Sequence, residues 1–278
     1  MASTPNDIRL IRMIQQTYIE PDRGLPRWAR RSNPIIRRQL GMYWKTILPE
    51  AAFFFKAFVV QAVFVLLTLP IPFLLEMALP IITAAILLFP FAVFMYGHTL
   101  LSIGSAAARA VTDELQKDTL NLLRVTPFDL RAILASKVAA SIWRQVEDLG
   151  LLLIAAALMS MPLLFWQYGW LLPMEAQPVL LRLAVILGLA VSILRLALEP
   201  FMIGMIGVAM GASLRNRASA IMATVISSIF YFLFLNLTRF IPMAWPLRFA
   251  VEFVLPLVAP LVVIYLMYRL ADHMLTRG

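Results

Sequence analysis

Long apolar segments constrain this chain more than any other feature of its sequence. Several of them exceed the roughly 18 residues that suggest a membrane-spanning helix, and none alternates in the way that an outer-membrane barrel strand does. Hydrophobic residues make up 62% of the 278 residues and charged residues 14%, against about 45–50% and about 25% in soluble proteins. The sequence therefore predicts an all-α integral membrane protein with one membrane domain, residues 49–278.

We expect the apolar segments to form six spans. Prolines and interfacial aromatic residues mark the turns between them, including the belt at Trp166, Tyr168 and Trp170. The expected spans are residues 57–75, 79–103, 149–165, 179–213, 218–237 and 253–268, with the second one returning to the cytoplasm at 105–109.

The basic residues predict the orientation of these spans. Nine lie between Arg9 and Lys45, six between Arg109 and Arg144, and four more at positions 215, 217, 269 and 277. Only Arg182, Arg239 and Arg248 fall on the opposite side. Because cytoplasmic loops are enriched in Lys and Arg, we expect a multi-pass protein of the cell (inner or plasma) membrane with both termini in the cytoplasm. In such a protein the net charge of +9 does not indicate nucleic-acid binding.

The N-terminal part contains a predicted interfacial helix. Residues 1–32 are polar and lack the apolar core and cleavage site of a signal peptide, so we expect a cytoplasmic segment. Asn33 is a good N-cap and Pro34 a good first helical residue. Over residues 33–48 an apolar face opposes Arg37 and Arg38, which is typical of a helix in the headgroup plane. A solvated linker is the alternative.

Residues 112–137 are the only long polar stretch between two hydrophobic blocks, and we predict a cytoplasmic helix-turn-helix there. Leu115, Leu122 and Leu123 form an apolar stripe at helical spacing. Pro127 would end that helix, and Thr126 would cap the next one. The stripe of the helix at 112–127 needs a surface to cover it, either lipid headgroups or another protein.

Charged residues near the third and fourth spans are candidates for function. Arg144 is three and four residues from Glu147 and Asp148, so these side chains can pair on one helix face. They form either an ion-pair collar at the interface or, if the span begins near Ile133, a polar group in a watery interior. Arg195 and Glu199 can also pair. Gly204, Gly207 and Gly211 follow at near-regular spacing, which favours close packing of another helix.

Several kinds of chemistry are disfavoured by the sequence. The chain has no cysteine and two histidines, which excludes thiolate metal sites, and we expect neither a metal nor a cofactor. No G-x-x-x-x-G-K-[ST] motif occurs, so the chain holds no nucleotide by a P-loop. No catalytic residues can be named, because no nucleophile motif, paired histidines or metal-ligand spacing supports the alternative of a membrane-embedded enzyme.

Three segments, in order, resemble permeases of the ABC-2 type. In the stretch 114–137 the matching positions are Glu114, Thr119, Leu120, Leu122, Leu123, Thr126, Pro127 and Lys137, whereas Asp118 replaces the glycine usual in the family. Residues 33–40 resemble the family's elbow helix, and residues 207–222 resemble its junction between the fourth and fifth spans.

The resemblance implies a half-transporter, namely the permease subunit of an ATP-driven exporter. Two six-span subunits, identical or different, would pair in the lipid bilayer, and each would take a separate ATPase subunit on its cytoplasmic face. The helix at 112–127 would be the coupling helix that docks on the ATPase, with Glu114, Leu115 and Thr119 at its start and the elbow helix beside it. The alternative is a structural or anchoring subunit that keeps this fold without transporting anything.

Overall fold

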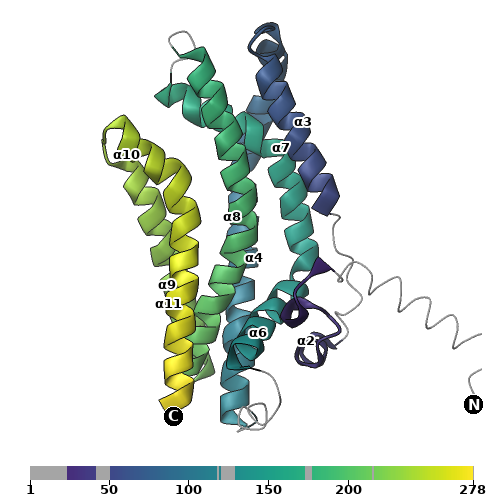
Figure 1. Ribbon diagram of the computed structural model, residues 1–278, viewed down its shortest axis with the longest axis vertical. Helices are drawn as coiled ribbons and strands as arrows, with labels where there is room; N and C mark the ends of the chain where they lie inside the picture. The colour runs from purple at the N-terminus through teal and green to yellow at the C-terminus, as the bar shows by residue number, and fades with distance from the viewer. Residues whose placement is uncertain are drawn as a thin grey trace, which may run out of the picture.

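The computed structural model describes residues 24–41, 51–117, 119, 129–172, 177–214 and 216–277, and all regular elements in these ranges are helices. Within them, five helices are long and apolar enough to cross a membrane, namely Phe73–Gln116, Val146–Leu171, Pro178–Ser213, Arg217–Phe240 and Pro246–Thr276. They run roughly along one axis (Figure 1). The predicted all-α class is confirmed, and helices of this length and composition make the chain a multi-pass membrane protein.

The N-terminal block consists of the short 3-10 helix η2 (Arg27–Ala29) and α2 (Pro34–Leu40). The predicted cap is confirmed, because the Asn33 side chain accepts a hydrogen bond from the Ile35 N–H and Pro34 is the first helical residue. The predicted single helix over 33–48 is wrong, since α2 ends at Leu40 and Gly41 has a φ of 55°. A positive φ is incompatible with continuing a right-handed helix. Residues 42–48 lie outside the described ranges.

The first hairpin is formed by α3 (Ala51–Leu67) and α4 (Phe73–Gln116). The turn at 68–72 contains Pro70 and Pro72, so the predicted first span ends at Leu67 and residues 73–75 belong to α4. Helix α4 continues through Pro80 and Pro90 without a break to Gln116. The expectation of a separate helix beginning at 112 is therefore wrong. Residues 112–116 are the last turn of α4.

The third hydrophobic block is divided into α6 (Leu130–Arg144) and α7 (Val146–Leu171) by a break at Gln145. Only α7 is a candidate span, and it begins before the predicted start at 149. Helix α6 lies across the lower end of the bundle, whereas α7 rises from it (Figure 1). The charges of this region therefore flank the start of the span instead of lying in its middle.

The remaining helices are α8 (Pro178–Ser213), α9 (Arg217–Phe240), the short α10 (Trp245–Phe249), the π-helix η4 (Ala250–Val254) and α11 (Leu255–Arg277). The fourth and fifth predicted spans are found as α8 and α9. The loop predicted between residues 238 and 248 is shorter than expected, because α9 continues to Phe240 and helical structure resumes at Trp245.

The centre of the bundle is the contact between α4 and α8, where the two backbones approach very closely. A Cβ added at Gly207 would lie 2.2 Å from the Gly104 carbonyl oxygen, and one added at Gly211 would lie 2.7 Å from the Ala108 carbonyl oxygen. The predicted packing role of Gly204, Gly207 and Gly211 is confirmed. Small residues allow the two helix backbones to approach closely. Helices in lipid associate largely through such van der Waals packing, because no hydrophobic driving force acts between them.

The two ends of the bundle are held by different contacts. At one end, α2 packs on α6 through a cluster that contains Ile36, Leu40 and Trp143. At the other end, buried Arg182 of α8 donates to the backbone and side-chain oxygens of Thr68 at 2.9 and 3.0 Å, which ties the α3–α4 turn to the start of α8. Residues 24–41 and the turn at 68–72 thus lie at opposite ends of the bundle (Figure 1).

Candidate functional site

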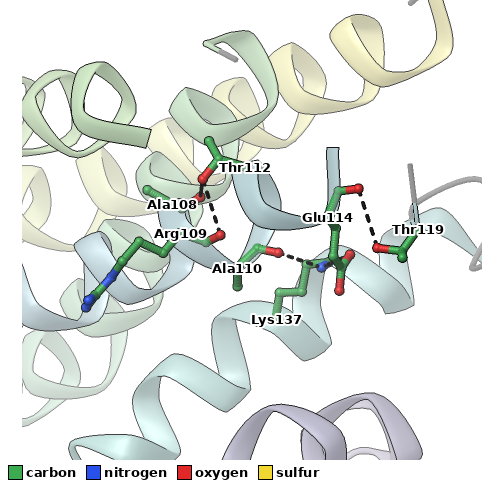
Figure 2. Close-up of polar contacts among 7 residues, drawn as sticks. All are labelled: Ala108, Arg109, Ala110, Thr112, Glu114, Thr119 and Lys137. Atoms are coloured by element: carbon green, nitrogen blue, oxygen red, sulfur yellow. Dashed lines mark hydrogen bonds and ion pairs between the residues drawn. The ribbon is translucent and has the colours of Figure 1, made fainter. Parts of the chain in front are cut away.

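A buried ion pair joins the end of α4 to α6, at the two sides of the predicted coupling segment. The Lys137 ammonium pairs with the Glu114 carboxylate and donates to the Ala110 carbonyl oxygen at 3.2 Å. Figure 2 shows Lys137 reaching from α6 to these two groups of α4. The contact therefore fixes the distance between the two ends of the chain that leads from Gln116 to Leu130.

The lysine is the more deeply buried partner. Its side chain is 0% exposed and that of Glu114 is 14% exposed. Burial lowers the pKa of Lys137, and the Glu114 carboxylate opposes this shift. A buried ammonium is costly unless it is paired and hydrogen-bonded. The Glu114 carboxylate therefore offsets part of the cost of burying the Lys137 ammonium.

Two other residues of the predicted coupling motif stabilise the end of α4. The Thr119 hydroxyl donates to the Glu114 carbonyl oxygen at 3.4 Å (Figure 2), so it caps a carbonyl that the ending helix leaves unpaired. Leu115 packs against a cluster that includes Val111, Leu134 and Leu275. Leu115 is thus partly covered by this chain. Leu122, Leu123, Thr126 and Pro127 lie outside the described residues.

The N-terminal block is attached to α6 by directional contacts. The Trp143 indole N–H donates to the Ala29 carbonyl oxygen at 2.9 Å, and the Arg31 guanidinium lies 4.7 Å from the ring centre of Trp143. The Asn33 side-chain amide donates to the Ser136 hydroxyl at 2.9 Å. The apolar face of α2 is consequently buried on protein, while Arg37 and Arg38 are exposed.

A polar cavity of about 260 Å³ opens beside the ion pair. Helices α2, α4, α6 and α9 contribute its charged side chains, which are Arg38, Arg109, Asp113, Glu114, Lys117, Arg144 and Arg217. Five of these are basic and two are acidic, so the lining carries an excess of three positive charges. Such a surface attracts negatively charged groups.

The predicted pairing of Arg144 with Glu147 or Asp148 is not formed among the described residues. Arg144 ends α6 and donates to the Gln39 carbonyl oxygen of the N-terminal block. Glu147 and Asp148 occupy the first turn of α7, where the exposed N–H groups of a helix favour negative charge. The break at Gln145 separates the two sets, and this is why the spacing of one continuous helix misled the prediction.

The predicted pair in the fourth span is confirmed. The Arg195 Nε donates to the Glu199 carboxylate at 2.7 Å, and Glu199 is only 1% exposed. The Tyr96 hydroxyl of α4 donates to the second oxygen of the same carboxylate. Glu199 thus links α8 to α4 as well as to its own helix.

Some of these partners could not be identified from the sequence. Lys137 and Glu114 are 23 residues apart and Tyr96 and Glu199 are 103 apart, and no periodic pattern connects such positions. Arg239 and Glu252, whose side chains lie 3.5 Å apart, are likewise not at helical spacing. The one available signal was charge: Glu114 and Lys137 are opposite charges on the two sides of the segment that resembles a coupling helix.

No cluster of three or more potential metal ligands occurs among the residues that the structure describes. The helices described above place the chain in the class of multi-pass α-helical membrane proteins. Comparison with known proteins found no matching family model, no matching curated protein and no matching solved structure.

Proposed function

We propose that this chain is the membrane-spanning subunit of an ATP-driven exporter of the ABC-2 type. It would pair with a second permease subunit, and a separate ATPase subunit would dock at the segment 112–127. The sequence support is the ordered resemblance of residues 33–40, 114–137 and 207–222, together with the absence of a P-loop.

The single observation that carries the proposal is the buried Glu114–Lys137 pair. The pair links the end of α4 to α6, next to the segment that would contact the ATPase. A force that the ATPase exerts on this segment would therefore move the ends of α4 and α6 together. Helix α4 in turn packs against α8 with backbone contact at Gly207 and Gly211. Interfaces packed this tightly transmit displacement as rigid-body motion.

Six crossings fit the geometry of the described residues. Residues 24–41 pack on α6 at one end of the bundle, and Thr68 contacts Arg182 at the other end. The chain between residues 41 and 68 connects these ends, so we propose that α3 is part of a sixth span. Both termini then lie on the same side, which is the cytoplasm by the distribution of basic residues.

The positively charged cavity supports the expected partner. It lies beside the base of the proposed coupling segment, and its excess of basic side chains is suited to a partner surface with carboxylates. An ATPase docked here would therefore present acidic residues to Arg38, Arg144 and Arg217. Its association should weaken as the salt concentration rises.

The test is purification of the tagged chain from its native membrane, followed by identification of its partners and assay of ATP hydrolysis. We expect an ATPase subunit to co-purify. The variant Leu122→Asp with Leu123→Asp should lose this partner and still insert into the membrane. The matched control is Met274→Asp with Thr276→Asp, which adds the same charge at exposed positions of α11 and should retain the partner.

Two results would contradict the proposal. A native complex without any nucleotide-binding subunit would favour the structural or anchoring role. Unchanged recovery of the ATPase with the Leu122→Asp and Leu123→Asp variant would exclude the segment as the docking element.

A further inference from the structure

A second cavity, of about 480 Å³, lies between α4, α7, α8 and α9. Its size falls within the roughly 300–1,000 Å³ of small-molecule sites. Arg195 on its wall is 17 residues after Pro178 and 18 before Ser213 in α8, which places it about 25 Å along the helix from either end. The cavity is therefore in the membrane-spanning part of the bundle, away from the polar cavity at the Glu114 end.

Most of the cavity wall is apolar. Helices α4 and α7 supply much of this surface, with Phe89, Val93, Leu152, Met159 and Leu163 among the lining residues, and α9 adds Phe232. A hydrocarbon tail can cover such a wall without losing any hydrogen bond. This part of the cavity suits the apolar portion of a ligand.

The charged part of the wall has an excess of one positive charge. Arg195, Glu199 and Arg239 are its charged lining residues, and the first two neutralise each other. Arg239 shares the Glu252 carboxylate with Arg248, so these two arginines and one carboxylate keep the same excess of one. Arg195 uses its Nε for Glu199, and in the part of the chain that the structure describes its two terminal amino groups have no acceptor. Its side chain is 26% exposed. These N–H groups are available to an anion in the cavity.

Arg239 is positioned at the cavity wall by Glu252, a buried residue that does not line the cavity. Its Nε lies 3.5 Å from the Glu252 carboxylate, which also accepts a hydrogen bond from the side-chain amide of Gln167 at 3.3 Å. Gln167 and Arg239 line the cavity, whereas Glu252 is 3% exposed and lies in the π-helix η4. Isolated π-helical turns occur frequently at functional sites. Here the turn carries the carboxylate that orients two lining side chains.

We propose that this cavity binds an amphipathic molecule with one negative charge, such as an anionic lipid. The headgroup would accept hydrogen bonds from Arg195 and Arg239, and the acyl chain would lie along α4 and α7. The charged groups at and behind the wall keep one positive charge in excess, and a monoanion in the cavity neutralises it. A cationic amphiphile would add to the excess charge, and a neutral one would leave it uncompensated.

This inference deepens the proposed function, because it names the class of substrate that the exporter would carry, and binding can be measured without an ATPase. The purified full-length chain is placed in nanodiscs of neutral phosphatidylcholine. The probes are photoreactive phosphatidylglycerol with one or with two acyl chains, which distinguishes a single-chain from a two-chain ligand. The matched control probe is photoreactive lysophosphatidylcholine, which has no net charge. Labelled residues are mapped by mass spectrometry.

We expect at least one of the two anionic probes to label residues that line the cavity, and the neutral probe to label them about tenfold less. The double variant with Arg195→Gln and Glu199→Gln keeps the local charge sum and removes the guanidinium with its charge-assisted N–H donors. Labelling should therefore fall about tenfold or more. Glu199→Gln alone releases the guanidinium and should increase labelling. Arg269→Gln, at an exposed position outside the cavity, should leave labelling unchanged.

The variant Ala156→Phe, which fills the cavity, gives a second test if the double variant does not fold. It should abolish labelling by the anionic probes. Equal labelling by anionic and neutral probes, or labelling that survives both Ala156→Phe and the double variant, would overturn the inference. If lipid labelling fails in this way but an ATPase still co-purifies, the lipid-binding inference is wrong and the proposed exporter role stands. If the anionic probe labels the cavity specifically but no ATPase co-purifies, the lipid-binding inference stands and the proposed exporter role is wrong.

Discussion

Lys137 of α6 places its ammonium between the carboxylate of Glu114 and the carbonyl oxygen of Ala110, although 23 residues separate the two charges. The pair thus connects the last turn of a long membrane helix to a short helix at its end. If either side chain moves away, the other is left as a charged group without its counter-charge.

Removing Glu114 should destabilise the fold more than removing Lys137. Glu114→Gln leaves a fully buried ammonium unpaired, whereas Lys137→Met leaves a carboxylate that is partly exposed. Breaking a buried pair from one side costs about 3–5 kcal/mol, and the larger loss is expected for Glu114→Gln. The double variant should recover part of the loss. Thermal unfolding of the purified chain measures the four proteins, and strictly additive effects would contradict the coupling of the two charges.

Gly207→Ala should prevent α4 and α8 from packing. The new Cβ would lie 2.2 Å from the backbone oxygen of Gly104, and backbone cannot move aside as a side-chain end can. We expect a loss of several kcal/mol, on the scale of severe overpacking, seen as a lower unfolding temperature and a lower yield. Gly97→Ala in α4 is the control, because nothing lies within 4 Å of its Cβ position. Alanine there should be neutral or stabilising by up to about 1 kcal/mol.

Trp143→Leu should loosen the N-terminal block from α6. The change removes the hydrogen bond to the Ala29 carbonyl oxygen and the ring that faces Arg31. An unpaired buried carbonyl costs about 1–3 kcal/mol. The fraction of molecules in which the N-terminal block is detached from α6 should therefore increase at least several-fold. Limited trypsin digestion at Arg37 and Arg38 reports that opening as faster cleavage. Trp170→Leu, at a position 79% exposed, should leave the rate unchanged.

Single cysteines can establish whether α3 crosses the membrane, because the chain has none of its own. A cysteine introduced by Ile71→Cys, in the turn between α3 and α4, should react with a membrane-impermeant maleimide in intact cells. The Arg37→Cys and Thr276→Cys variants should react only after permeabilisation. Reaction of the Arg37→Cys variant in intact cells would show that the N-terminal block is outside, and the proposed sixth crossing would then be wrong.

Local features of this protein follow from its sequence. The length and apolarity of the segments determine a helical membrane protein, because backbone groups in lipid must be satisfied within each segment. The cap at Asn33 and the pair Arg195–Glu199 also involve neighbours one turn apart or less, so a local pattern is sufficient to predict them. The packing role of Gly207 could be predicted because glycines at this spacing lie on one face of a helix.

Only the tertiary structure decided which distant groups meet. Helix α4 continues to Gln116 because its last turn is packed against α6 and α11 and its charge at Glu114 is met by Lys137, and these contacts outweigh the local polarity that suggested a new helix at 112. Likewise, the break at Gln145 turns Arg144 toward the Gln39 carbonyl oxygen instead of Glu147 or Asp148. Contacts between residues far apart depend on how whole helices pack, and a period of 3.6 residues contains no information about them.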